Sequence, residues 1–128
     1  MVDMEKYALC LGVFAPCADR YVTCGYHKEL SLEQMIHAAS QVEDASGIEI
    51  DYPFMAPANE DPHWLKRILD NVGLKLCTIE IDHYSNPKWK NGALTSEDKK
   101  IRQDAIAISK RGMDLAIELG ASQINLWL

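Results

Sequence analysis

Carboxyl and imidazole side chains gather at the end of one apolar segment of the sequence, where they could transfer protons. Glu80 lies inside the segment 74–82, and His83 follows that segment directly. A carboxyl or imidazole group beside a substrate can give or take a proton, so we predict both as catalytic residues. Two plainer interpretations stay open: His83 as a solvated loop histidine, and Glu80 as one half of a structural ion pair.

Polar and aromatic residues at the ends of three apolar segments are predicted to bind the substrate. A carboxylate accepts hydrogen bonds, an amide both donates and accepts them, and an aromatic face packs against an apolar surface. The predicted binding residues are Asp51, Tyr52, Asp82, Asn125 and Trp127. Trp127 has a second interpretation as a core residue. Glu49 lies deeper in its segment than Asp51 and is more simply structural.

Each of these segments alternates polar and apolar residues. Successive side chains of a strand point to opposite faces, so alternation places the polar ones on a shared face. The polar sets are Glu49 and Asp51; Thr78, Glu80 and Asp82; and Gln123, Asn125 and Trp127. An open doubly wound sheet buries both of its faces under helices and would be apolar on both. A barrel with a polar lumen explains the pattern better.

The elements that must position these residues alternate strand and helix along the chain. The predicted strands are 7–14, 48–52, 74–82 and 123–128, and the predicted helices are 32–43, 62–72 and a long one that ends near 119. Ser31, Asp61 and either Thr95 or Ser96 are the expected helix caps. This alternation predicts an α/β fold with parallel strands and right-handed crossovers. Four strands are half of a (β/α)8 TIM barrel, so the fold predicted for residues 1–128 is a partial barrel.

Five stretches of the sequence resemble the xylose-isomerase-like TIM barrels, the family of sugar phosphate isomerases and epimerases. Residues 47–53 (GIEIDYP) are similar to a second-strand GVELDYP segment, and residues 73–76 (GLKL) to a GLKV opening of the third strand. The stretches 110–116, 118–121 and 125–127 resemble the family's third helix and fourth strand. The resemblance implies that the chain is the N-terminal half of such a barrel.

The resemblance also implies an activity. Members of the family are divalent-metal-dependent isomerases or epimerases of small sugars or sugar phosphates, using Mn, Mg, Co or Zn. The metal acts as a Lewis acid on the carbonyl while a base moves a proton between adjacent carbons. Their metal ligands come mainly from strands five to eight, so we predict no metal ligand in this chain and an incomplete metal site. A sugar-contacting histidine near the end of the third strand corresponds to His83.

Other functions are compatible with the same half-barrel. The chain could be a catalytically inactive fragment, or an assembly subunit that pairs with a copy of itself or with a missing C-terminal half. An endonuclease-IV-like metal hydrolase shares the barrel, but it would need histidine ligands on strands three and four and a basic surface. Asn125 stands on the fourth strand instead, and the formal net charge is −6.

The composition of the chain indicates which binding partners and which cellular compartment to expect. The acidic balance and the lack of a basic cluster predict no nucleic-acid partner. No apolar run reaches the roughly 20 residues that cross a bilayer, so we expect no membrane association. The N-terminus carries charges of both signs and no apolar block, which predicts a cytoplasmic protein.

The four cysteines favour reduced structural thiols over a metal site. None of them forms a CxxC pair. Cys17, Cys24 and His27 follow no recognised zinc spacing, and no fourth ligand is evident beside them. Cys10 and Cys77 fall inside apolar strand patterns, where a thiol usually acts as a small buried hydrophobe.

Overall fold

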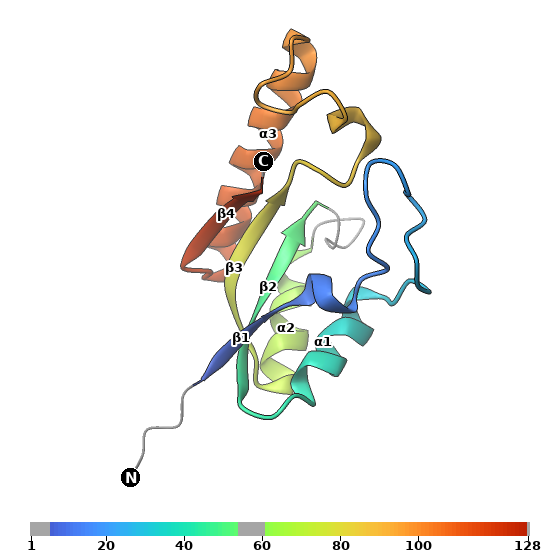
Figure 1. The fold of residues 1–128 in the computed structure, drawn as a ribbon. Coiled ribbons are helices and arrows are strands. Elements are labelled where there is room, and N and C mark those ends of the chain that lie inside the picture. Colours follow the sequence, from blue (N-terminus) through green and yellow to red (C-terminus); the bar gives the residue numbers. More distant parts are fainter. Residues whose placement is uncertain (1–5, 54–60, 128) are drawn as a thin grey trace.

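A computed structural model of the chain describes residues 6–53 and 61–127. Its four strands form one parallel sheet in the order β1-β2-β3-β4, which curls into half of a barrel (Figure 1). The strands are β1 (Tyr7–Cys10), β2 (Ala45–Tyr52), β3 (Lys75–Asp82) and β4 (Gln123–Trp127). The helices are α1 (Leu32–Ser40), α2 (Pro62–Val72) and α3 (Lys99–Leu119), with short 3-10 helices η1 (Leu11–Phe14) and η2 (Pro87–Trp89). The predicted partial α/β barrel with parallel strands is confirmed.

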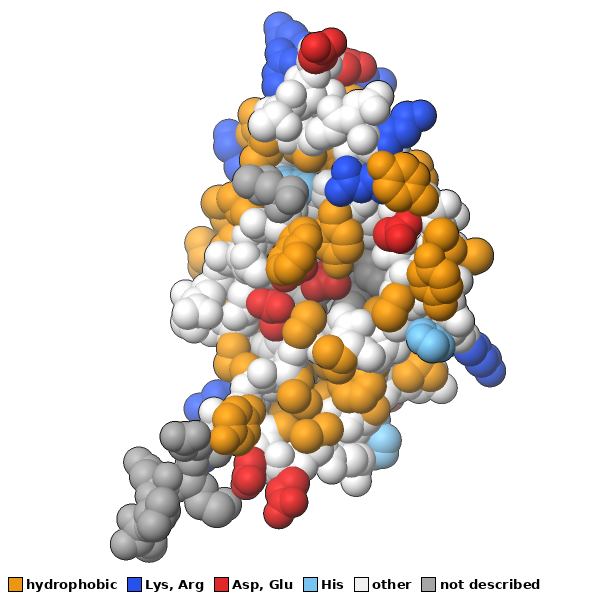
Figure 2. Space-filling model, viewed as in Figure 1, with side chains coloured by type: hydrophobic (Ala, Val, Ile, Leu, Met, Phe, Trp, Pro, Cys, Tyr) orange, Lys and Arg blue, Asp and Glu red, His pale blue; other side chains and the backbone are white. Residues whose placement is uncertain are grey.

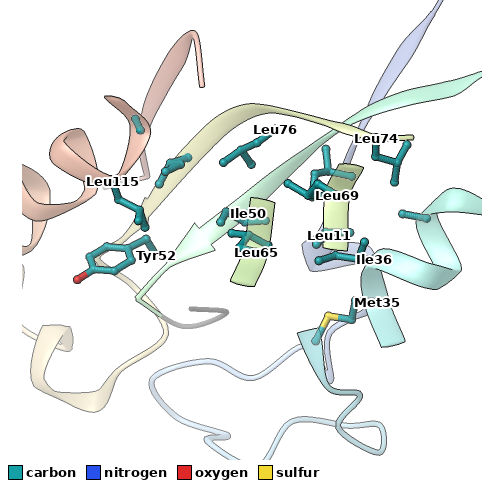
Figure 3. Close-up of a cluster of buried hydrophobic side chains, with 14 of the residues drawn as sticks. Leu11, Met35, Ile36, Ile50, Tyr52, Leu65, Leu69, Leu74, Leu76 and Leu115 are labelled. Carbon is teal, nitrogen blue, oxygen red and sulfur yellow. The ribbon is translucent and has the colours of Figure 1, made fainter. Parts of the chain in front are cut away.

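The isoleucines predicted to share one face of β2 and β3 form the centre of the core. Ile48, Ile50, Ile79 and Ile81 are each at most 1% exposed. Figure 3 shows the cluster they belong to, in which α2 contributes Leu65 and Leu69 and α3 contributes Leu115. Burying one such side chain contributes about 1.5–3 kcal/mol. The helices therefore cover one face of the sheet and leave the polar face on the concave side.

The first predicted strand is too long. β1 ends at Cys10, and η1 takes up residues 11–14. Leu11 is fully buried while Val13 is 69% exposed, so the apolar run turns one side chain into the core and another outward. β1 is an edge strand whose register with β2 ends at the Cys10–Glu49 pair, and no second neighbour among the described strands extends it. Hydrophobicity alone does not separate a strand from such a turn.

The cap of the third helix is also corrected. Asp98 is the N-cap residue, and its carboxylate accepts a hydrogen bond from the Lys100 backbone N–H at 2.7 Å. Ser96, one of the two residues expected there, accepts a hydrogen bond from the Asp98 N–H at 3.3 Å and so supports the turn before the helix. Ser31 and Asp61 cap α1 and α2 as predicted. No helix within the described ranges is long and apolar enough to cross a membrane.

Alanine at Gly112 should destabilise the fold, because α3 crosses β3 closely there. A Cβ at Gly112 would overlap the terminal methyl of Ile81, which is fully buried. Overpacking costs about 1–3 kcal/mol, against a helix-propensity gain of up to about 1 kcal/mol. We expect a net loss in free energy of unfolding, measured in urea. Ile81→Val removes that methyl, so Gly112→Ala should cost less in the Ile81→Val background; equal costs in both backgrounds would refute the close contact.

Candidate functional site

Strand register brings three of the predicted site residues into one row. Asp51 on β2 lies opposite Glu80 on β3, and Glu80 lies opposite Asn125 on β4. The Asn125 amide nitrogen donates a hydrogen bond to a Glu80 carboxylate oxygen at 2.9 Å. This row crosses the concave face of the sheet, close to the carboxyl ends of the strands, where parallel barrels place their functional residues.

An open pocket of about 450 Å³, which we call the lumen pocket, lies over this row. It is lined by Cys10, Gly12, Val13, Glu49, Asp51, Glu80, Tyr84, Asn125 and Trp127. Figure 2 shows acidic side chains beside apolar ones near the middle of this face. Four of the predicted site residues therefore share one cavity: Asp51, Glu80, Asn125 and Trp127.

Asp51 is the most deeply buried carboxylate that lines the lumen pocket. It is 3% exposed, and its Oδ1 has no hydrogen-bond partner among the described residues. Burial, followed by the negative charges of Asp82 and Glu49, raises the pKa of Asp51 to about 6, while an interaction with the Tyr84 side chain lowers it. An unpartnered, buried carboxylate oxygen is a strong acceptor for a ligand that offers a hydroxyl hydrogen.

Glu80 is poised to exchange a proton near neutral pH. It is 5% exposed, and burial together with the nearby charges of Asp51 and Glu49 raises its pKa to about 7. The hydrogen bond from Asn125 stabilises the ionised form and limits that rise. A carboxyl group with a pKa close to the working pH is suited to general acid–base chemistry.

Replacing Asn125 by alanine should raise the pKa of Glu80 above about 7, because the ionised carboxylate loses its amide donor. The shift can be read by titrating the ¹³C carboxyl resonance of Glu80 in the folded chain. Gln123→Ala is the matched control. Gln123 lies two register pairs deeper on β4 and contacts Thr78 at 3.2 Å, so its loss should leave the Glu80 titration in place. Equal titrations of all three proteins would contradict the prediction.

The structure places His83 apart from this row. It is 2% exposed and turned toward α3, where its Nε2 lies 3.2 Å from the Ala105 carbonyl oxygen and 3.4 Å from Ser109 Oγ. Its ring packs edge-on against Trp89, with 5.5 Å between the ring centroids. Burial lowers its pKa, which favours the neutral imidazole. The histidine is not the solvated loop residue considered above, and its catalytic role stays a prediction.

Two other predicted binding residues, Asp82 and Tyr52, stabilise the fold. The Asp82 carboxylate accepts hydrogen bonds from the backbone N–H groups of Tyr84 at 2.9 Å and Ser85 at 2.8 Å, and from the Ser85 hydroxyl. These bonds turn the chain at the end of β3. Tyr52 is 4% exposed and belongs to the core cluster beside the helices (Figure 3). Neither residue lines the lumen pocket, and their roles in binding stay predictions.

Tyr84 is an aromatic residue of the pocket that the sequence analysis did not predict. The turn at Asp82 folds it back over the lumen pocket, where its ring lies 6.2 Å from that of Trp127. The two rings give the acidic row an aromatic border. Cys10 was not predicted either; burial raises the pKa of its thiol to about 11, so it lines the pocket as a neutral group.

The described residues do not form a complete metal site. Within the ranges 6–53 and 61–127, no three His, Cys, Asp or Glu side chains converge in a way that could hold an ion. A protein-bound divalent cation usually takes at least three such ligands, or several oxygen donors. Asp51 and Glu80, side by side, fall short of such a donor set.

Comparison with known proteins finds relatives for part of the chain. Xylose isomerase from Thermus thermophilus is 40% identical over 62 residues, and xylose isomerase from Thermus caldophilus shows the same identity over the same length. In each case the match covers 48% of this chain and 16% of the relative. No protein-family profile matches the sequence. The chain thus has a partial, xylose-isomerase-like similarity and spans a small share of these enzymes.

Proposed function

We propose that this chain forms one side of the substrate site of an isomerase or epimerase that acts on a small sugar or sugar phosphate. The observation that carries the proposal is the row of Asp51, Glu80 and Asn125 across three strands, with pKa values near neutrality for both carboxyl groups. The partial similarity to xylose isomerases supports the same reaction class.

The lumen pocket suits a polyhydroxylated substrate. The Asp51 carboxylate can accept a hydroxyl hydrogen, and the Asn125 amide can donate to or accept from a neighbouring oxygen. The aromatic border made by Tyr84 and Trp127 packs against the C–H groups of the sugar chain. A volume of about 450 Å³ lies in the range of small-molecule sites.

We assign proton transfer to Glu80. Isomerisation moves hydrogen between adjacent carbons and between the oxygens that they carry, so a group that is half protonated near pH 7 can both give and take a proton. Asp51, with the lower pKa, is the more ionised partner and holds a substrate hydroxyl. Proton transfer at Glu80 and hydroxyl binding at Asp51 therefore come from adjacent residues.

We also expect a divalent metal ion to take part in the reaction and a partner to close the lumen of the half-barrel. We expect Mn, Mg, Co or Zn, held mainly by residues other than those described, and none of the steps above depends on it. β1 and β4 are the edges of the sheet, so a second copy or a further half-barrel pairing with them would close the lumen. The solution mass of the chain distinguishes a monomer from a dimer.

Sugar binding and hydrogen exchange test the proposal together. The chain is titrated with tetroses, pentoses, hexoses and their phosphates, with Mg²⁺ present, while the ¹³C carboxyl resonances of Asp51 and Glu80 are recorded. Parallel samples in D₂O, with Mg²⁺, Mn²⁺ or Co²⁺, report deuterium entering the sugar beside the carbonyl. We expect saturable carboxyl shifts and exchange with at least one sugar. If no sugar shifts either carboxyl resonance, the assignment is wrong.

A further inference from the structure

The lumen pocket carries negative charge that no basic side chain balances. Three carboxylates line it, from Glu49 and Asp51 on β2 and from Glu80 on β3. None of the described residues that line the pocket is Lys, Arg or His. Like charges in a cleft repel an anionic ligand and attract a cationic one. The charge of a bound sugar should therefore change its affinity for this pocket.

Asp51 lies at the centre of this charge. It is opposite Glu80 on the adjacent strand, about 4.8 Å away, and two residues beyond Glu49 on the same face of β2, about 7 Å along the strand. It is 3% exposed, and one of its carboxylate oxygens has no hydrogen-bond partner among the described residues. A buried carboxylate that lacks donors is stabilised most by a ligand that brings both donors and positive charge.

An alkylammonium group is such a ligand. It carries one positive charge and three N–H donors, so it can donate to Asp51 and still reach a second acceptor. A hydroxyl group has a single hydrogen to donate and carries no charge. A divalent cation also brings positive charge, but the described residues offer no group of three ligands for one. The acidic row therefore favours an ammonium group over a hydroxyl group.

The aromatic border of the lumen pocket favours the same charge. Trp127 lines the pocket and is 56% exposed, and its ring lies 6.2 Å from that of Tyr84. A cation within about 6 Å of an aromatic ring centre is attracted to the face of the ring, most strongly for Trp. An ammonium group in the pocket can therefore be attracted by the acidic row and by this border.

A phosphate group is unfavourable in the same pocket. A phosphate monoester carries about 1.5 to 2 negative charges at pH 7, which add to the repulsion among the three carboxylates. The basic side chains of Arg20 and Lys88 contact Trp89, which does not line the lumen pocket. The part of the pocket that the structure describes therefore has no cation to pair with a phosphate.

We propose that the lumen pocket selects its sugar by charge and that its substrate class is the amino sugars, with the ammonium group held by Asp51. Glu49 determines this specificity, because it adds negative charge on the same face of β2 without taking part in proton transfer. The inference rests on the proposed function and narrows it. Asp51 then binds an ammonium group in place of a hydroxyl, and Glu80 keeps its role in proton transfer.

Three polyols with the same carbon skeleton test the charge preference: 1-amino-1-deoxyglucitol, glucitol and glucitol 1-phosphate. None of them has a carbonyl to isomerise, so binding is measured apart from activity. Affinities come from the saturable shifts of the Asp51 and Glu80 ¹³C carboxyl resonances at pH 8 in EDTA, where an alkylammonium group stays protonated. We expect the amine to bind about 5- to 100-fold tighter than glucitol, and the phosphate to bind more weakly than glucitol.

The pH dependence identifies the carboxylates as the cause. The titratable groups on the strands and turn around Asp51 and Glu80 are Cys10, Glu49, Asp82 and Tyr84, and β4 supplies none. Burial raises the pKa of both Cys10 and Tyr84, so both are neutral from pH 5 to 8. At pH 5, below the pKa values of about 6 and 7, Asp51 and Glu80 are mostly protonated, and the preference for the amine should shrink.

Two further measurements separate charge from shape. Saturating amine should lower the pKa of Glu80 from about 7, because a bound cation favours the ionised carboxylate, and glucitol should lower it less. Glu49→Gln keeps the size of the side chain and removes one charge. It should reduce the ratio of amine to glucitol affinity by about 2- to 5-fold at pH 8.

Three results would overturn the charge preference: an amine that gives no saturable shift, equal affinities for the amine and glucitol, or tighter binding of the phosphate than of glucitol. A ratio that Glu49→Gln leaves unchanged would remove Glu49 as the specificity determinant. Failure of the proposed function looks different, because then none of the tetroses, pentoses, hexoses or their phosphates shifts either carboxyl resonance.

Discussion

Replacing Glu80 by glutamine should reduce deuterium exchange into the bound sugar by about 100- to 10,000-fold, the usual contribution of a general acid–base group. Glutamine keeps the size of the side chain and an oxygen for the Asn125 amide, which lies 2.9 Å from the carboxylate. It cannot take up and release a proton near pH 7. Sugar binding, read from the Asp51 resonance, should change far less than the exchange rate.

Glu49→Gln is the matched control, because Glu49 lines the same pocket on β2. Its negative charge raises the pKa values of both Asp51 and Glu80. Removing it should lower both pKa values and move the exchange profile to lower pH without abolishing exchange. If Glu80→Gln exchanges hydrogen as fast as the unchanged chain, another group carries the proton, and the role assigned to Glu80 is wrong.

The strand alternation in the sequence was enough to predict the acidic row. In a parallel sheet the register fixes which residues lie opposite each other, so period-two patterns in β2, β3 and β4 place Asp51, Glu80 and Asn125 on one face. Parallel order followed from the alternation of strands and helices. The parallel direction of the strands and the shared face of these three residues could therefore be predicted from the sequence alone.

Just beyond the end of β3, residue type and strand period point to different residues. The period that points Glu80 and Asp82 toward the lumen continues to Tyr84, not to His83, and the structure keeps that parity through the Asp82 turn. The prediction of His83 as catalytic depended on the ability of its imidazole to give or take a proton. Its position against Ala105 and Ser109 depends on a contact with α3 more than twenty residues away, which no local pattern encodes.

Burial and hydrogen bonding were the features least accessible from the sequence. Asp51 and Asp82 share one face and one residue type, yet Asp51 keeps a free oxygen while the Asp82 carboxylate is bound by the turn. The difference arises from the loop that follows β3, where Ser85 supplies two of the donors. Short-range turn chemistry of this kind decides which of two similar carboxylates can meet a ligand.

Two tryptophans near the carboxyl end of the sheet should respond in opposite ways to alanine substitution. Trp89 is 1% exposed and packs with Ala93 and Ala105, so Trp89→Ala should lower the free energy of unfolding by about 3–5 kcal/mol. Trp127 is 56% exposed at the rim of the lumen pocket. Trp127→Ala should change stability by only about 0.5 kcal/mol, as surface substitutions usually do, and should weaken sugar binding.

Urea unfolding and the carboxyl titrations separate these two effects. Trp89→Ala is measured at a temperature where most of the chain stays folded, so sugar binding in the lumen pocket can still be read. Because Trp89 is no part of that pocket, the affinity of the folded fraction should be retained. A large loss of stability on Trp127→Ala with unchanged sugar binding would make Trp127 the core residue considered at the outset, and the aromatic border of the pocket would then have no role in binding.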